Sequence, residues 1–85
     1  PSGIRVNAIS PGPIADTEGM RRLAGTAEML EQTTNSLALR ELGTKDDIAD
    51  AAIWLCSPAA RYVTGTIIEV EGGTSLGDAS GALKL

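Results

Sequence analysis

Two strand-like segments lie far apart in the sequence, and this separation constrains the fold more than any other feature. In Ile4–Ser10 the apolar residues Ile4, Val6 and Ala8 recur at every second position, and Thr66–Glu71 is rich in β-branched residues. The stretch between the two segments is too long for a hairpin, and its pattern is helical. This arrangement favours a parallel strand pair joined by a right-handed crossover.

Three helices are predicted between the strands. The first begins at Asp16 or Thr17, one of which is the expected N-cap, and ends near Ala24. The second is predicted over Thr26–Leu39 and the third over Thr44–Ser57. The third helix is expected to pack over both strands.

The third helix has the clearest start and the widest apolar surface. Thr44 is a good N-cap, and acidic residues follow it at positions where the helix dipole favours negative charge. Ile48, Ala52 and Leu55 form the predicted inner stripe, and further apolar residues widen it: Ala49, Ala51, Ile53 and Trp54. A helix of this kind is expected to pack on two sides, so we predict that a second subunit covers the last helix and the last strand.

Composition excludes several classes of protein. The chain has 85 residues, no histidine and a net charge of −4, and its largest basic cluster is the pair Arg21–Arg22. A nucleic-acid-binding surface and a basic membrane-surface helix are therefore not expected. No apolar run approaches the ~20 residues of a membrane span. The lack of histidine excludes a Cys/His zinc site, and the single Cys56 is expected to be a buried structural thiol in a reducing, intracellular setting.

One crossover unit gives only two strands, which would leave both sheet edges open and the helices packed on too little. We therefore predict an α/β fold in which the chain is the last βαβ unit of a larger, doubly wound parallel sheet. Residues 1–73 carry this unit, and residues 74–85 form a tail rich in glycine, serine and alanine that is typical of a linker.

The turn after the first strand is a candidate ligand site, because ligands of open parallel sheets bind outside the carboxyl ends of the strands. Pro11 and Pro13 stiffen this turn, and Gly12 lacks a Cβ, so a flat ring could approach the backbone. Ile14 offers a backbone N–H and C=O to an amide. The start of the next helix, at Asp16 or Thr17, offers N–H groups to a phosphate. A rigid turn without a ligand remains the alternative.

Several spaced motifs now resemble one family. The stretch GIRVNAISPGPIADT, followed by LGTKDDIADAAIWLCSPAARYVTGTIIEVEGG, is similar to the C-terminal part of short-chain dehydrogenases/reductases. The resemblance covers nearly all of residues 3–73. Within this family, P-G-P-I followed by T-E-G and two arginines resembles peroxisomal 2,4-dienoyl-CoA reductases, and bacterial 3-oxoacyl-carrier-protein reductases share much of the remaining pattern.

The resemblance implies a three-layer, Rossmann-like α/β/α fold in the full protein, with residues 1–73 as the C-terminal part of its NAD(P)-binding domain. It implies that residues 11–17 bind the nicotinamide end of NADP, with NADPH expected rather than NADH. The segment comprises Pro11, Gly12, Pro13, Ile14, Ala15, Asp16 and Thr17. Many family members place a threonine where this chain has Asp16, so Thr17 is expected to take that role while Asp16 caps the helix.

The family's catalytic Tyr-x-x-x-Lys set does not occur in this chain, since Tyr62 is followed at the fourth position by Thr66. The family's glycine-rich phosphate loop is also absent. The resemblance therefore implies an oxidoreductase as the complete protein, with no catalytic residue and no hydride transfer in this chain alone.

The resemblance further implies a fatty acyl-CoA substrate, with Arg22, or alternatively Arg21, binding a CoA phosphate. A carrier-protein reductase or another alcohol dehydrogenase is the alternative, and a non-catalytic assembly module is an alternative of another class. Related enzymes form tetramers through the last helix and strand. The C-terminal Leu83-Lys84-Leu85 resembles a peroxisomal targeting tripeptide, although its first residue is not small; without that signal a cytoplasmic location is expected.

Overall fold

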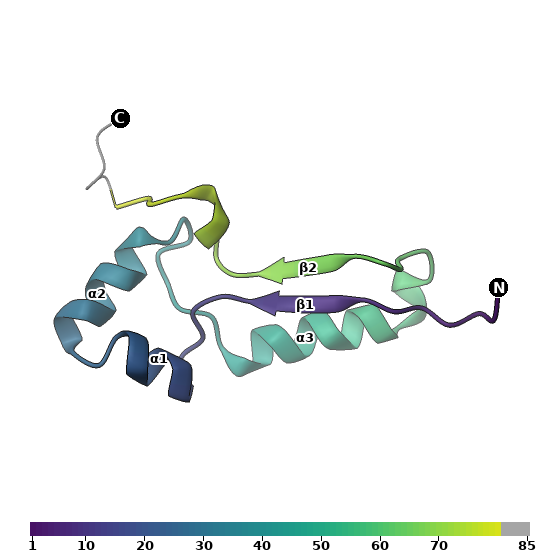
Figure 1. The fold of residues 1–85 in the computed structure, drawn as a ribbon, viewed down its shortest axis with the longest axis horizontal. Coiled ribbons are helices and arrows are strands. Elements are labelled where there is room, and N and C mark those ends of the chain that lie inside the picture. Colours follow the sequence, from purple (N-terminus) through teal and green to yellow (C-terminus); the bar gives the residue numbers. More distant parts are fainter. Residues whose placement is uncertain (81–85) are drawn as a thin grey trace.

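A computed structural model describes residues 1–80, which form a two-stranded sheet, one long helix beside it and two shorter helices beyond one end of the sheet (Figure 1). In chain order, the elements are β1 (Ala8–Pro11), α1 (Glu18–Leu23), α2 (Ala27–Ser36), α3 (Lys45–Cys56), the 3₁₀ turn η1 (Pro58–Ala60), β2 (Ile67–Val70) and the 3₁₀ turn η2 (Thr74–Leu76).

The two strands are parallel, as predicted. Ala8 lies opposite Ile67, and the register runs to Pro11 opposite Val70. β1 begins later than the sequence pattern suggests, because the Asn7 side chain takes the place of regular ladder bonds. Its amide nitrogen donates to the Val63 carbonyl at 3.0 Å, and its oxygen accepts from the Thr66 N–H at 3.1 Å.

Arg5 extends this side-chain pairing toward the N-terminus. Its guanidinium donates to the carbonyl of Val63 at 3.0 Å and to that of Leu55 at 2.7 Å. The Leu55 carbonyl belongs to the last turn of α3, where helices leave carbonyls without intrahelical partners. Arg5 therefore ties the start of the chain to the end of α3.

α3 confirms the predicted helix start. The Thr44 hydroxyl accepts from the Asp47 N–H at 3.1 Å, and the Asp47 carboxylate accepts from the Thr44 N–H at 2.8 Å, which completes a capping box. Leu55 is buried, and Ile48 and Ala52 are half-buried on the side that packs along both strands.

The opposite flank of α3 is uncovered. Ile53 is 67% exposed and Trp54 is 43% exposed. Cys56 is also exposed, so the expectation of a buried thiol is wrong for this chain. Cys56 is the last residue of α3, where it lines an open hollow together with Arg5, Val6 and Ala52, and this hollow leaves the thiol exposed.

α2 is shorter than predicted. It starts after its N-cap Thr26, whose hydroxyl accepts from the Met29 N–H, but it ends at Ser36 instead of Leu39. Leu37 leaves the helical conformation with φ −82° and ψ 142°, and its side chain is only 1% exposed. Burial of this leucine therefore takes precedence over another helical turn.

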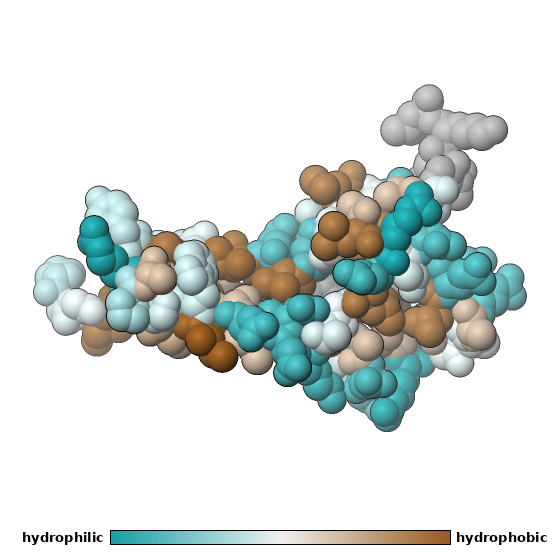
Figure 2. Space-filling view, turned by 180° about the vertical axis from the view of Figure 1, so that it is seen from behind, coloured by the Kyte–Doolittle hydropathy of each residue, from teal (hydrophilic) through white to brown (hydrophobic). Residues whose placement is uncertain are grey.

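The chain forms two layers and leaves much apolar surface open. Its extents are 49 × 31 × 17 Å, and the shortest accommodates a sheet and one helix layer. Ile4, Val6 and Ile67 are each more than 60% exposed, and Figure 2 shows hydrophobic residues among hydrophilic ones on one face. The described residues thus form the predicted α/β unit, without the third layer expected of a complete doubly wound domain.

The predicted tail is bonded to the rest of the chain over part of its length. Thr74–Leu76 forms η2, and the Ala79 N–H donates to the Ser36 carbonyl at 2.9 Å. The tripeptide Leu83-Lys84-Leu85 lies outside the described residues. Within residues 1–80, no helix has the length and apolarity needed to cross a membrane.

Candidate functional site

The predicted ligand turn, residues 11–17, lies at the carboxyl end of β1. The Gly12 N–H donates to the Val70 carbonyl at 3.0 Å, so the turn begins as a continuation of the strand pair. A Cβ on Gly12 would lie 2.6 Å from the Cα of Glu71. The space left by the missing Cβ is therefore filled by the backbone after β2, so a flat ring would have to approach Gly12 from another side.

Gly43 holds the other side of the turn. Its N–H donates to the Pro13 carbonyl at 3.0 Å, and its carbonyl accepts from the Ala15 N–H at 2.9 Å. A Cβ on Gly43 would lie 2.8 Å from the Cδ1 atom of Ile14, so only glycine fits without a shift of that side chain. No role for Gly43 was predicted from the sequence, although Gly43 lies in the second stretch that carries the family resemblance.

Ile14 presents an unused donor. Because Pro13 and Ala15 both bond Gly43, the N–H and C=O of Ile14 point to the opposite side, as in any extended segment. The Ile14 carbonyl accepts from the Thr17 hydroxyl at 2.8 Å and keeps a second lone pair. The Ile14 N–H has no hydrogen-bond partner among residues 1–80. A donor and an acceptor on one residue match the two polar ends of a carboxamide.

Thr17, and not Asp16, caps α1. The Thr17 hydroxyl accepts from the Met20 N–H at 3.2 Å, and Thr17 has the extended backbone that an N-cap requires. Asp16 has a φ of 60°, which places it in the left-handed region within the turn. The expectation that Asp16 caps the helix is therefore wrong. Its exposed carboxylate remains at the rim of the turn.

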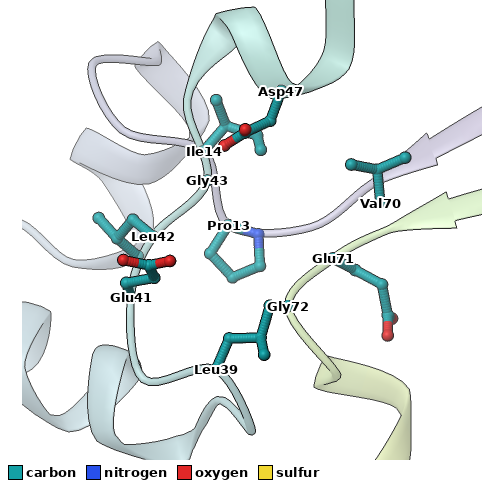
Figure 3. A pocket seen from close by; sticks show the side chains of 10 residues that line it. All are labelled: Pro13, Ile14, Leu39, Glu41, Leu42, Gly43, Asp47, Val70, Glu71 and Gly72. Atoms are coloured by element: carbon teal, nitrogen blue, oxygen red, sulfur yellow. The ribbon is translucent and has the colours of Figure 1, made fainter. Parts of the chain in front are cut away.

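A cavity of about 280 Å³ lies behind the turn, with the Pro13 ring at the centre of the view in Figure 3. Its lining combines apolar side chains and glycines with three carboxylates: Pro13, Ile14, Leu39, Glu41, Leu42, Gly43, Asp47, Val70, Glu71 and Gly72. The lining contains no basic side chain, so this side of the turn disfavours a phosphate.

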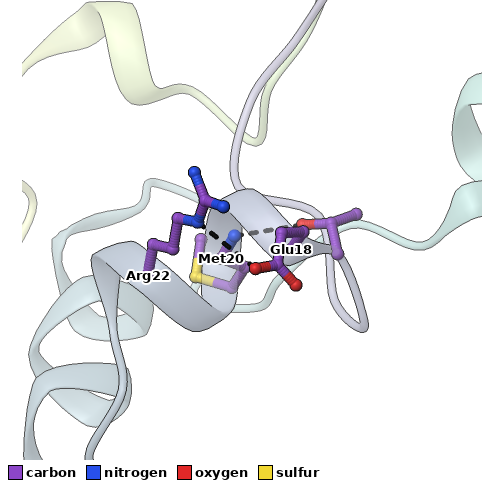
Figure 4. Close-up of polar contacts among 4 residues, drawn as sticks. Glu18, Met20 and Arg22 are labelled. Atoms are coloured by element: carbon purple, nitrogen blue, oxygen red, sulfur yellow. Dashed lines mark hydrogen bonds and ion pairs between the residues drawn. The ribbon is translucent and has the colours of Figure 1, made fainter.

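The two arginines of α1 lie in different surroundings. Arg22 forms an ion pair with Glu18, Nε to Oε1 at 3.2 Å, and the two side chains are 79% and 68% exposed (Figure 4). Arg21 instead lines a second cavity of about 200 Å³ together with Asp16 and Thr17. Of the two, Arg21 is therefore the one that adjoins the predicted ligand turn.

Tyr62 lies outside the site. It is 92% exposed and precedes β2, so it lies near the amino ends of the strands and not near the turn. Among residues 1–80, no group of three or more histidine, cysteine or acidic side chains is arranged to hold a metal ion. The groups that the turn itself presents are therefore its stiff backbone and the polar backbone atoms of Ile14.

Comparisons with known proteins found similar sequences over most of the chain. A family model described as "Enoyl-(Acyl carrier protein) reductase" matches residues 1–75. The chain is 45% identical over 76 residues to a peroxisomal 2,4-dienoyl-CoA reductase of Pongo abelii, covering 89% of this chain and 26% of that protein. It is 48% identical over 73 residues to the corresponding enzyme of Saccharomyces cerevisiae, covering 86% and 25%. The chain thus spans about a quarter of the length of these relatives.

Two solved structures show the same architecture. A 4-hydroxyisoleucine dehydrogenase mutant complexed with NADH and succinate has a TM-score of 0.77 and 32% identity, covering 88% of this chain and 30% of that one. A second structure, from Agrobacterium tumefaciens with bound NADP, is described as that of a proposed 2-deoxy-D-gluconate 3-dehydrogenase. It has a TM-score of 0.73 and 38% identity, covering 85% of this chain and 29% of that one.

Proposed function

The chain belongs to the short-chain dehydrogenase/reductase family, and on that premise we propose that the complete protein is an NADP-dependent oxidoreductase that reduces a fatty acyl-CoA, as a 2,4-dienoyl-CoA reductase does. Cofactor binding is supported by one observation above all: the N–H of Ile14, on a stiff turn, has no hydrogen-bond partner among residues 1–80. The substrate half is supported by the identity to the peroxisomal reductases of two organisms.

Residues 11–17 are proposed to bind the nicotinamide end of the cofactor. Pro11, Gly12 and Pro13 form the surface against which the ring rests, and Ile14 bonds the carboxamide through its backbone. Ala15 and Thr17 continue the site toward α1, and NADPH supplies the hydride when it is bound. Because Gly12 and Gly43 hold the turn from both sides, the turn has its geometry before a ligand arrives.

Arg21 and Arg22 are proposed to serve the CoA end of the substrate. The sequence favoured Arg22, but its guanidinium is paired with Glu18, whereas Arg21 lines the cavity beside Thr17. An exposed pair of this kind is worth only ~0–1 kcal/mol, so Arg22 can exchange Glu18 for a phosphate at little cost. Each of the two arginines is therefore substituted in the test.

The test uses the complete protein and follows NADPH consumption. A 2,4-dienoyl-CoA is the expected substrate, and Arg21→Ala and Arg22→Ala are expected to raise the KM for it, one of them by roughly tenfold or more, since a hydrogen bond to a charged group is worth ~1.5–3 kcal/mol. The KM for NADPH should stay unchanged. If the protein instead prefers a carrier-protein thioester, the alternative of a carrier-protein reductase is favoured, in line with the family description "Enoyl-(Acyl carrier protein) reductase".

The same kinetic assay also tests the preference for NADPH and the expectation that this chain alone is inactive. NADPH is expected to be a better donor than NADH, and equal rates would contradict the NADP preference. The 85-residue chain alone is expected to transfer no hydride, because it holds no Tyr-x-x-x-Lys pair. Hydride transfer by the chain alone would overturn this division of roles.

Assembly is the second candidate function, favoured by the uncovered flank of α3. Ile53 and Trp54 are exposed there, and both outer edges of the described sheet are open. We propose that α3 and β2 pair with a second copy in a homotetramer. Elution of the complete protein as a monomer at micromolar concentration would contradict this. A peroxisomal location is proposed from the relatives and from Leu83-Lys84-Leu85.

A further inference from the structure

We propose that residues 72–79, immediately after β2, act as a strap that holds the α1–α2 segment, residues 15–42, in position over the ligand turn. The strap would thereby set the shape of the substrate side of the site. This role differs from that of a loose C-terminal linker, and it is carried by backbone contacts on both sides of the strap.

The α1–α2 segment stands apart from the rest of the fold (Figure 1). The main packing between elements joins α3 to η1 and to both strands, and neither α1 nor α2 takes part in it. The two ends of the segment meet where Ile14 pairs with Gly43. A segment joined only at this point could swing as a body, so its position depends on whatever holds its far side.

The strap supplies that second attachment. The Leu39 N–H donates to the Gly72 carbonyl at 3.1 Å, and the Ala79 N–H donates to the Ser36 carbonyl at 2.9 Å. Between these bonds the backbones lie close together, since a Cβ on Gly73 would be 2.5 Å from the Cβ of Ala38. The end of α2 is thus held at two separated points by the segment that follows β2.

Arg40 closes the contact from the other side. Its guanidinium donates to the Ala79 carbonyl at 2.9 Å, so one backbone group of Ala79 is bonded to the last residue of α2 and the other to Arg40 beyond it. Arg40 has a φ of 56°, a conformation that costs energy for a residue with a side chain. Its N–H donates to the Leu37 carbonyl at 3.0 Å, and this turn directs the guanidinium to the strap.

Arg40→Asn in the complete protein tests the strap, because asparagine tolerates a positive φ but is too short to reach Ala79. Hydrogen exchange of the α1 and α2 amides is expected to become about fivefold faster, which corresponds to the ~1 kcal/mol of one hydrogen bond. Exchange in α3 and β2 should not change. Arg61→Asn is the charge-matched control, since Arg61 lies beside Tyr62 and away from the strap.

Ala79→Pro removes the other bond, because proline has no N–H, and Ala79→Ser retains it as the control. The proline variant should show the same faster exchange confined to α1 and α2. Unchanged exchange in both Arg40→Asn and Ala79→Pro, or an equal increase in α3, would overturn the proposal.

The kinetic readout rests on the proposed function, whereas the exchange readout does not. Both variants are expected to raise the KM for acyl-CoA about threefold or more and to change the KM for NADPH less, because the bond from Ala15 to Gly43 holds the cofactor end of the segment. Faster exchange with no turnover of acyl-CoA by the unmodified protein would contradict the proposed function and leave the strap supported. Faster exchange with an unchanged KM for acyl-CoA would overturn the strap's role in shaping the substrate site.

Discussion

Gly12→Ala tests directly how the ligand turn is positioned. The added Cβ would lie 2.6 Å from the Cα of Glu71, 2.7 Å from its Cβ and 3.0 Å from its carbonyl oxygen. Two of these three atoms belong to the backbone, so rotation of a side chain cannot relieve the contact. The carboxyl ends of β1 and β2 must separate to admit the methyl group.

The cost follows from what this separation disturbs. Overpacking of a tight contact costs ~1–3 kcal/mol, and loss of the 3.0 Å bond from the Gly12 N–H to the Val70 carbonyl adds ~0.5–1.5 kcal/mol. Lower chain entropy of the unfolded alanine variant returns ~0.4–1 kcal/mol. The free energy of unfolding of the complete protein is therefore expected to fall by about 2–3 kcal/mol, with a raised KM for NADPH because the turn moves.

Two other glycines provide matched controls. A Cβ on Gly43 meets the end of the Ile14 side chain at 2.8 Å, so Gly43→Ala should destabilise less than Gly12→Ala. A Cβ on Gly19 meets nothing within 4 Å, and Gly19 lies within α1, so Gly19→Ala should stabilise by ~0.5–1 kcal/mol. Urea denaturation of the three variants measures this order. A Gly12→Ala protein as stable as the unmodified one would refute the reasoning.

Three further predictions concern single side chains. Thr17→Val removes the N-cap of α1 and should cost ~1 kcal/mol in the free energy of unfolding and raise the KM for NADPH, while Thr17→Ser should retain both properties. Arg5→Ala leaves the Leu55 and Val63 carbonyls without this donor and should cost ~1–3 kcal/mol by urea denaturation, whereas Arg61→Ala should change little. Hydrogen bonds from the Ser80 side chain and backbone lower the pKa of Asp78 below its ordinary value of 3.8, so the local Asp78–Ser80 contact should persist above that pH and weaken as the pH falls through the lowered pKa; carboxyl NMR titration measures this shift, and a pKa at or above 3.8 would contradict it.

The sequence was sufficient to predict the elements and their topology. Alternation in the first strand, the N-cap Thr44 and the long interval between the two strands predicted a parallel pair with α3 packed over it, and all of this is present. These features are local or follow from chain connectivity, so periodicity and capping rules capture them.

Other features depend on contacts between residues distant in sequence. Gly12 faces Glu71 and Gly43 faces Ile14, and no pattern along the chain reveals either approach. The choice of Thr17 over Asp16 as N-cap depended on a positive φ that the turn imposes on Asp16. The strap was missed because its composition is that of a linker, while its order comes from bonds to the end of α2.

The exposure of Cys56 illustrates a different limit. An apolar stretch predicts burial, but it does not say whether the covering surface belongs to the same chain. α3 buries Leu55 against the strands, leaves Ile53 uncovered on its other flank, and leaves Cys56 exposed at its last residue. The sequence pattern therefore predicted the helix correctly, but it did not predict which of its apolar residues this chain buries.

The central claim is that the Ile14 backbone receives the nicotinamide carboxamide, and a crystal structure of the complete protein with bound NADP tests it most directly. The account predicts the carboxamide oxygen about 2.9 Å from the Ile14 nitrogen, with the ring against Pro11–Pro13. A nicotinamide bound elsewhere, with the Ile14 N–H bonded to another protein group, would contradict it.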